Sequence, residues 1–212
     1  MNISQNKSGQ FIVLEGGEGV GKSTNLAFIG DYLKSKGIPF ITTREPGGTP
    51  IAEDIRQIIL KENIEKIDSK TELLLIFAAR NQHLQNKILP NLNAGTWVLC
   101  DRFTDSTYAY QGAARGLDLE TIELLEKMVV SERRPDSVII LDGSIELSNA
   151  RLANRGIEKD RLEKESEAFH QSVLSAYRAR SQQFDHYHLV DASQTLQAVQ
   201  SDILSIINTL IE

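Results

Sequence analysis

The sequence predicts an α/β fold built on a mainly parallel sheet of five strands flanked by helices. Short runs rich in valine, isoleucine and leucine alternate with longer segments of helical periodicity, and each run is compatible with burial on both of its faces. A glycine-rich stretch joins the first run to the first helix. The five predicted strands are Phe11–Glu15, Pro39–Thr43, Thr96–Asp101, Ser137–Asp142 and Tyr187–Asp191.

Four segments between or after these strands are predicted as helices. Thr24–Lys36 carries apolar residues at helical spacing and is followed by a glycine. Ser69–Leu89 contains no glycine or proline and is too long for a strand, so we expect one long, largely buried helix that Pro90 stops. Arg161–Phe184 and Thr195–Ile211 are predicted as two helices on either side of the last strand.

Composition limits the classes of protein that the chain can represent. With 212 residues, 41% of them hydrophobic, and no linker, we expect one domain over residues 1–212. The net charge of −6 gives no support for nucleic-acid binding, so the expected partners are small molecules. Cys100 lies in an apolar run, so we expect it to be a buried, reduced thiol. Met1–Gln10 lacks an apolar signal core and no stretch reaches membrane-spanning length, which predicts a soluble, cytoplasmic protein.

The glycine-rich stretch Gly16–Ser23 fits the phosphate-binding pattern G-x-x-x-x-G-K-[ST]. A strand precedes it and a helix follows it, which separates it from a chance match in a glycine-rich linker. Its backbone N–H groups can converge on anionic oxygens, Lys22 adds positive charge, and Ser23 offers a hydroxyl to Mg²⁺. The predicted triphosphate site comprises Gly16, Gly17, Glu18, Gly19, Val20, Gly21, Lys22, Ser23 and Thr24.

Polar residues follow the second and third strands, where open α/β sheets bind ligands. Thr43–Thr49 contains two glycines and an Arg44–Glu45 pair, for which we favour a ligand-binding loop over a tight turn with a solvated ion pair. Asp101 can hold Mg²⁺ and Arg102 a phosphate oxygen, a plain surface ion pair being the alternative. Phe103–Gly112 concentrates hydroxyls, an amide and aromatic rings, which is typical of a pocket for a planar ring.

A basic segment over about residues 151–162 admits two interpretations. It can be a lid whose arginines close over a transferring phosphoryl group, or a solvated helix face with ion pairs, and on this segment alone both stay open. Its basic residues are Arg151, Arg155, Lys159 and Arg161. The four histidines show no metal-ligand spacing and are expected to be structural or to lie at the surface: His83, His170, His186 and His188.

Taken together, five segments closely resemble bacterial thymidylate kinase, in the same order and with similar intervals. These segments are Phe11–Thr24, Thr43–Thr49, Phe77–His83, Asp101–Gly112 and Asp160–Glu165. The phosphate-binding loop alone would fit many nucleotide-binding proteins, whereas the other segments point to this family. The resemblance implies a three-layer P-loop kinase fold, a homodimer, and transfer of the γ-phosphoryl group of Mg-ATP to deoxythymidine 5′-monophosphate (dTMP), a step in dTTP synthesis for DNA replication.

The resemblance also implies roles for individual residues. Lys22 and the loop amides cradle the ATP phosphates, with Ser23 at Mg²⁺. Glu18 corresponds to the acid that touches the 3′-hydroxyl of the acceptor sugar. Arg102 clamps the acceptor phosphate, helped by two further arginines, and one carboxylate orients that cluster; these three residues are Arg44, Arg56 and Glu45.

For the acceptor base, the resemblance implies that Arg80, Thr107 and Gln111 read the edges of thymine and that Tyr110 lies against the sugar and disfavours a ribose 2′-hydroxyl. The family's stacking phenylalanine lies four residues before the base-reading arginine. Ile76 stands there in this chain and Phe77 one residue later, so either could stack on thymine. Since Gly17–Val20 contains no basic residue, the resemblance favours the lid arginines as catalytic, namely Arg151, Arg155 and Arg161.

Two other functions compete with this interpretation. A kinase for another nucleoside monophosphate would use the same fold with different groups at the base. A nucleotide-binding regulatory module would need the phosphate-binding loop alone, and the second phosphate cluster of Arg44, Arg56 and Arg102 argues against it.

Overall fold

The predicted parallel sheet is confirmed. The computed structural model describes residues 8–61, 65–131, 133–153 and 160–211. In these ranges five strands, all parallel, pair in the order β2-β3-β1-β4-β5. They are β1 Phe11–Gly16, β2 Phe40–Arg44, β3 Trp97–Asp101, β4 Ser137–Asp142 and β5 Tyr187–Asp191.

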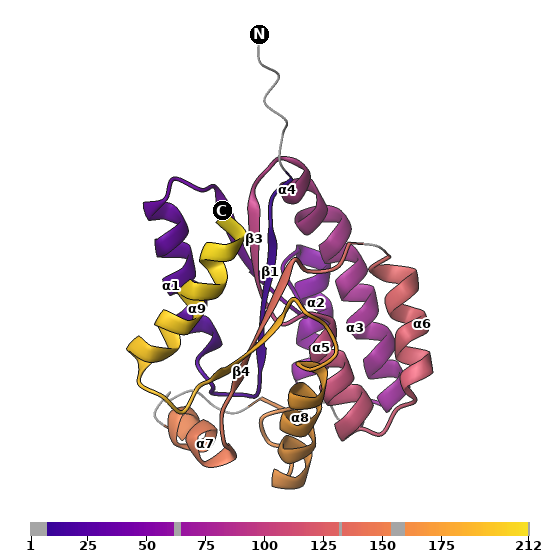
Figure 1. Ribbon diagram of the computed structural model, residues 1–212. Helices are drawn as coiled ribbons and strands as arrows, with labels where there is room; N and C mark the ends of the chain where they lie inside the picture. Colours follow the sequence, from indigo (N-terminus) through magenta and orange to yellow (C-terminus); the bar gives the residue numbers. More distant parts are fainter. Residues whose placement is uncertain (1–7, 62–64, 132, 154–159, 212) are drawn as a thin grey trace.

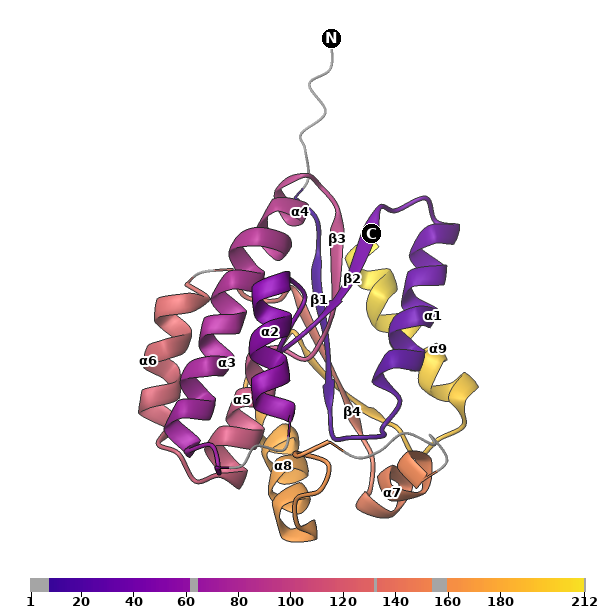
Figure 2. The same ribbon diagram turned by 180° about the vertical axis from the view of Figure 1, so that it is seen from behind.

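Helices cover both faces of this sheet, so the molecule has three layers (Figures 1 and 2). Their bounds are α1 Lys22–Ser35, α2 Pro50–Leu60, α3 Ser69–His83, η1 Leu84–Ile88, α4 Leu89–Asn93, α5 Thr104–Thr107, η2 Tyr108–Ala114, α6 Leu119–Val129, α7 Ile145–Ala153, α8 Glu167–Arg180 and α9 Leu196–Ile211. Among the described residues, no helix is long and apolar enough to cross a membrane.

Side chains of the central strands alternate between two hydrophobic cores, as strand geometry requires. In β1, Phe11 and Val13 pack into one core with residues of η1, η2 and α8, while Ile12 and Leu14 pack into the other with α1 and α9. Cys100 on β3 is a free, buried thiol, as predicted, and burial raises its pKa well above the ordinary value. Burial on both faces explains the nearly continuous apolar runs in the sequence.

The prediction that Pro90 stops a helix over Ser69–Leu89 is wrong. The helix passes through a π-helical segment, η1, and continues as α4 to Asn93. Pro90 lies in the first turn of α4, where its missing N–H matters least and its fixed φ suits the helix. The π turn is closed by the N–H of Leu89, which donates to the carbonyl of Leu84 five residues earlier.

The predicted helix Arg161–Phe184 is shorter in the structure, where α8 begins at Glu167 and ends at Arg180. Ser166 caps it by accepting a hydrogen bond from the N–H of Phe169. Before the cap, the carboxylate of Asp160 accepts the N–H groups of Leu162 and Glu163 and so forms a turn instead of a helix. The apolar periodicity of the sequence does not reveal that a turn, and not a helix, precedes Glu167.

Candidate active site

The carboxyl ends of β1, β2 and β3 open onto one cavity of about 950 Å³, at the edge of the sheet where the topology predicts a ligand site. Its volume is in the range of small-molecule sites. Most of the predicted site residues line it, although they come from segments far apart in the sequence. These are Glu18, Gly19, Gly21, Lys22, Ser23, Thr24, Arg44, Glu45, Arg56, Arg80, Asp101, Arg102, Thr107, Tyr110, Gln111 and Arg151.

The loop between β1 and α1 has the geometry of an anion-binding turn. Gly21 has φ 103° and stands at the N-terminus of α1, and the first residues of this helix line the cavity. The N–H groups of a first helical turn have no partner within the helix and can bind an anion. Gly16 also has positive φ, and a Cβ there would lie 2.5 Å from the carbonyl oxygen of Leu141. Only glycine fits at that position, because it tolerates both the backbone angle and the close approach of β4.

Lys22 reaches back across the loop. Its Nζ donates to the carbonyl oxygens of Gly16 at 3.2 Å and Gly17 at 2.7 Å. Burial and the neighbouring Arg102 cation lower the pKa of Lys22, partly offset by Glu18. An anionic ligand at this position would stabilise the ammonium charge.

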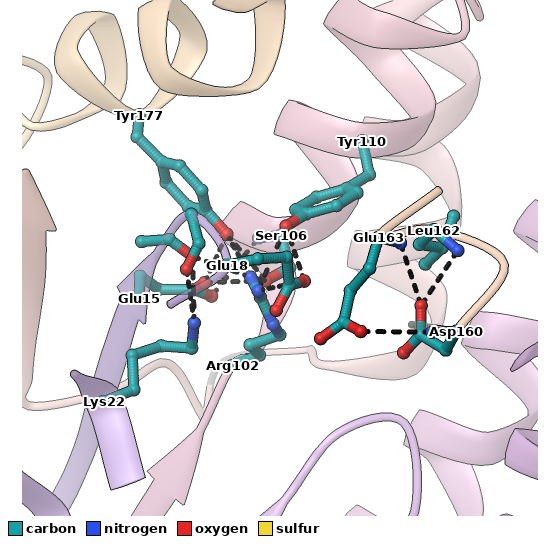
Figure 3. A network of polar contacts seen from close by, with 12 residues as sticks. Glu15, Glu18, Lys22, Arg102, Ser106, Tyr110, Asp160, Leu162, Glu163 and Tyr177 are labelled. Carbon is teal, nitrogen blue, oxygen red and sulfur yellow. Dashed lines mark hydrogen bonds and ion pairs between the residues drawn. The ribbon is translucent and has the colours of Figure 1, made fainter. Parts of the chain in front are cut away.

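Arg102 is the centre of a polar network that Figure 3 shows from close by. Its guanidinium donates to Glu18 at 2.6 Å, to the hydroxyls of Tyr110 and Tyr177 at 3.0 and 2.9 Å, and to the carbonyl of Gly16 at 2.9 Å. The residue has positive φ, an uncommon conformation for a non-glycine side chain and one often found at functional sites. The network holds the cation at the floor of the cavity.

Glu18 is the anionic partner of Arg102. Its partial burial would raise its pKa, but the Arg102 and Lys22 cations and the hydroxyl of Tyr110 outweigh that effect and hold the pKa at about 2. The carboxylate therefore stays ionised and paired with Arg102. This pair connects the phosphate-binding loop with the arginines predicted to bind a second phosphate.

Sequence reasoning missed Glu15, which lies next to the end of β1 and is completely buried. Its carboxylate accepts hydrogen bonds from the N–H groups of Phe103 and Ser106 and from the hydroxyls of Ser106 and Tyr177 (Figure 3). Burial and the nearby Asp105 raise its pKa. A carboxylate inside an apolar strand was the available signal, whereas nothing in the sequence connects it with Tyr177, which lies 162 positions away.

The residues expected at Mg²⁺ suit that ion. Asp101 Oδ1 is buried and has no hydrogen-bond partner in the described part of the chain, and Ser23 is exposed at the same cavity. One carboxylate and one hydroxyl match the way Mg²⁺ is held in phosphate-transferring sites, where phosphate oxygens and waters complete its octahedron. Consistent with this sparse set, the described residues contain no cluster of three or more His, Cys, Asp or Glu able to cage a metal.

The expectation that Glu45 orients the arginines of the phosphate cluster is not what the contacts show. Glu45 Oε2 accepts from Arg80 Nε at 2.7 Å, and its Oε1 lies 3.0 Å from His83 Nδ1. His83 is completely buried and also contacts the Thr43 hydroxyl at 2.7 Å, so it is structural, as predicted. Glu45 therefore fixes Arg80, the arginine predicted to read the base, because the turn after β2 brings Glu45 against α3.

Arg44 and Arg56 lie at the cavity with other partners. Arg44 pairs with Glu53 at 2.9 Å while its side chain stays about half exposed, and Arg56 donates to the carbonyl of Pro46 at 3.0 Å. Burial and the Arg44 cation lower the pKa of Arg56. Several cations gathered at one cavity attract an anionic ligand.

Of the two candidates for stacking on the base, Ile76 and Phe77, the structure brings only Ile76 to the cavity, so Phe77 is not at the predicted site. Ile76 lines the cavity, whereas Phe77 packs with Leu73, Tyr108 and Ile122 in a separate apolar cluster. Successive residues of a helix point about 100° apart, so only one of the two can face the cavity. Phe77 still supports the pocket, because its ring lies 4.9 Å from the guanidinium carbon of Arg80.

Two of the three arginines predicted to form a lid, Arg151 and Arg161, lie in the described part of the chain, and their positions differ. Arg151 lies over the phosphate-binding loop and donates to the carbonyl of Val20 at 2.9 Å. Arg161 is turned to α2 and α3, where it donates to the carbonyl of Ile59 at 2.8 Å and pairs with Glu72. Arg155 and Lys159 lie outside the described residues. Of the two described arginines, Arg151 is the one that lines the cavity.

One cavity joins the phosphate-binding loop between β1 and α1 to a further group of arginines. These features define a P-loop kinase of the nucleoside monophosphate class. Comparison with known proteins specifies the family. The family model described as thymidylate kinase matches residues 14–203, and the chain belongs to this family.

Several known proteins are similar to this chain over nearly its full length. The chain is similar to a protein named thymidylate kinase from Chromohalobacter salexigens, with 51% identity over 92% of this chain and 93% of that protein. It is also similar to proteins of the same name from Ectopseudomonas mendocina, with 50% identity over 97% of this chain and 98% of the relative, and from Ruthia magnifica, with 49% identity over 95% and 98%.

Proposed function

We propose that this enzyme transfers the γ-phosphoryl group of ATP to dTMP and so forms dTDP, a step toward dTTP for DNA replication. The observation that carries the proposal is that one cavity joins the phosphate-binding loop to a second set of phosphate-binding arginines through Glu18 and Arg102. A site that only bound or hydrolysed a triphosphate would have no use for the second set. Membership of the thymidylate kinase family supports dTMP as the acceptor.

On the donor side, the N–H groups of the loop and Lys22 bind the ATP phosphates, and Ser23 and Asp101 hold Mg²⁺. When bound, Mg²⁺ supplies positive charge that offsets the charge of the phosphate oxygens. Arg151 supplies a further cation above the loop, which itself contains no basic residue between Gly17 and Val20. Arg155 is proposed for the same task. The contacts of Arg161 with Ile59 and Glu72 favour an anchoring role instead.

On the acceptor side, Arg102 clamps the phosphate of dTMP with help from Arg44 and Arg56, and Glu18 orients the sugar through its 3′-hydroxyl. No general base is needed, because the acceptor phosphate is already an anionic nucleophile. Holding the two phosphates in line and neutralising their charge supplies most of the acceleration. Arg80, Thr107 and Gln111 read the base, while Tyr110 occupies the space of a ribose 2′-hydroxyl.

We further propose that the protein is a homodimer acting in the cytoplasm. Six large apolar side chains are about half exposed or more on three neighbouring helices, α2, α3 and α6, which lie side by side in Figures 1 and 2. They are Ile51, Ile58, Leu74, Leu119, Leu124 and Met128. Apolar area of this kind on a soluble protein commonly marks a contact surface.

The decisive experiment is a coupled assay of ADP production with a panel of nucleoside monophosphates. We expect dTMP to be the best acceptor by kcat/KM. A better acceptor among the other monophosphates would assign the enzyme to a different substrate on the same fold. Rapid ATP hydrolysis in the absence of any acceptor would favour the regulatory module.

A further inference from the structure

Glu72, in the first turn of α3, has a buried carboxylate that the proposed mechanism does not use. Only 1% of the residue is exposed, and a carboxylate is rarely buried to this extent unless it is paired. Three donors surround it, two from η2 and its C-cap and one from the segment before α8. Its Oε1 accepts from Gln111 Nε2 at 2.8 Å and lies 3.5 Å from Arg115 Nε, and its Oε2 pairs with Arg161.

The two arginines fix the carboxylate. Arg161 is itself held by the carbonyl of Ile59, and Arg115 is held by Glu165 at 2.7 Å and by the ring of Phe169, whose centre lies 4.8 Å from its guanidinium carbon. Burial would raise the pKa of Glu72, but hydrogen bonds from Gln111 and Arg161 and the charges of the two arginines outweigh it and lower the pKa. Glu72 is therefore ionised near neutral pH, and both of its oxygens are engaged.

An ionised carboxylate can only accept hydrogen bonds, so it decides which way the Gln111 amide is turned. The NH₂ end must face Glu72, because the reverse orientation would place the amide oxygen against a negative oxygen. The carbonyl end, Oε1, accepts no hydrogen bond within the described part of the chain, and Gln111 lines the cavity beside Thr107 and Arg80. The pocket therefore offers the base an acceptor from this residue.

We propose that Glu72 is a positioning residue that sets base specificity by holding the Gln111 carbonyl toward the acceptor base. The inference rests on dTMP being the acceptor. Thymine and uracil carry an N–H at ring position 3 and can donate to this carbonyl. Cytosine carries a bare nitrogen there, so two acceptors would face each other. Sites that match a substrate hydrogen bond reject analogues that leave the buried group unpaired much more strongly than they reject a missing methyl group.

The experiment compares dTMP with 5-methyl-dCMP, which keeps the methyl group and the sugar and changes only the hydrogen-bonding edge. In Glu72→Gln, residue 72 can donate as well as accept, so the Gln111 amide is free to turn over. We expect the ratio of kcat/KM for the two acceptors to fall by roughly tenfold or more, with the KM for ATP unchanged. Glu126→Gln is the matched control, since Glu126 is a buried carboxylate that binds the Tyr108 hydroxyl at 2.6 Å.

A double variant tests whether Glu72 acts through Gln111. In the Gln111→Ala background, Glu72→Gln should leave the acceptor ratio within about twofold. An equal loss of kcat/KM for both acceptors in Glu72→Gln would overturn the proposal and leave Glu72 a structural role.

The wild-type enzyme gives a test that does not depend on a variant folding. It should prefer dTMP over 5-methyl-dCMP by roughly 100-fold or more, and over N3-methyl-dTMP by a similar factor. Comparable use of 5-methyl-dCMP and dTMP would overturn the fixed orientation of the amide. Failure of the wild type to phosphorylate dTMP would instead refute the proposed function, so the two failures are distinct.

Discussion

Arg102 donates to Glu18 and to the hydroxyls of Tyr110 and Tyr177, and we assign it to the acceptor phosphate. Its replacement should therefore affect acceptor binding more than donor binding. We expect Arg102→Ala to raise the KM for dTMP by at least tenfold, which corresponds to roughly 1.4 kcal/mol for the lost charge-assisted bonds. The KM for ATP should change by less than about twofold, because the loop and Lys22 remain. Initial rates with each substrate varied in turn provide the measurement.

Arg102→Lys is the control for charge, because it keeps the cation and loses the planar fork. It should recover part of the dTMP affinity. If the two KM values rise together in Arg102→Ala, the assignment of Arg102 to the acceptor phosphate is wrong.

The ionisation of Glu18 makes the stability of the folded protein depend on pH. Its pKa is about 2 in the folded protein and about 4.5 in the absence of its partners, chiefly because the Arg102 cation outweighs the cost of burial. A carboxyl group whose pKa is lower in the folded protein stabilises the fold at pH values above its unfolded-state pKa. This contribution is lost as the pH falls from about 4.5 toward 2. The stability difference between wild type and Glu18→Gln should therefore be larger at about pH 6 than at about pH 3. Urea midpoints of both proteins at the two pH values test this, and a constant difference would contradict it.

At the scale of elements, the turn between β2 and α2 depends on Gly48. The residue has φ +88°, and a Cβ there would lie 2.4 Å from His83 Nε2 and 2.7 Å from the Thr43 hydroxyl oxygen. Gly48→Ala should destabilise the fold by about 2–4 kcal/mol, from the left-handed backbone and from overpacking against α3. Chemical denaturation measures the loss.

Gly37 is the matched control for this turn. It also has positive φ, +69°, but a Cβ at this position would have no atom of the described residues within 4 Å. Gly37→Ala should therefore cost only the backbone term of about 1–2 kcal/mol. Equal losses in the two variants would mean that contact with His83 contributes nothing.

The elements also show where sequence reasoning succeeds. Ser137–Asp142 and Tyr187–Asp191 form strands with the predicted bounds, because a strand buried on both faces leaves a local apolar signature. The phosphate-binding loop is equally local, since its spacing is fixed by the turn between one strand and one helix. The helix at Pro90 was misjudged because the position of a proline within the first turn decides whether it stops a helix.

At the scale of the whole molecule, the exposed apolar side chains on α2, α3 and α6 lead to a prediction about assembly. Leu74 on α3 is 58% exposed. Leu74→Asp should dissociate the proposed dimer, because a charge would be buried in its contact surface. Leu196→Asp on α9, where the leucine is 51% exposed in the opposite helical layer, should not. Analytical ultracentrifugation distinguishes a dimer from the 23.7 kDa chain, and a wild-type monomer would refute the assembly.

The sequence by itself determined the sheet, the phosphate-binding loop and the identity of most cavity residues, because each follows from local patterning or from a short motif. Only the tertiary structure decided the partners of those residues. Glu45 joins Arg80 and His83, Glu15 joins Tyr177, and Ile76 takes the wall position in place of Phe77. Such contacts join segments that are distant in the chain. Which groups meet depends on how each helix is rotated and where each side chain points, and no local sequence pattern shows this.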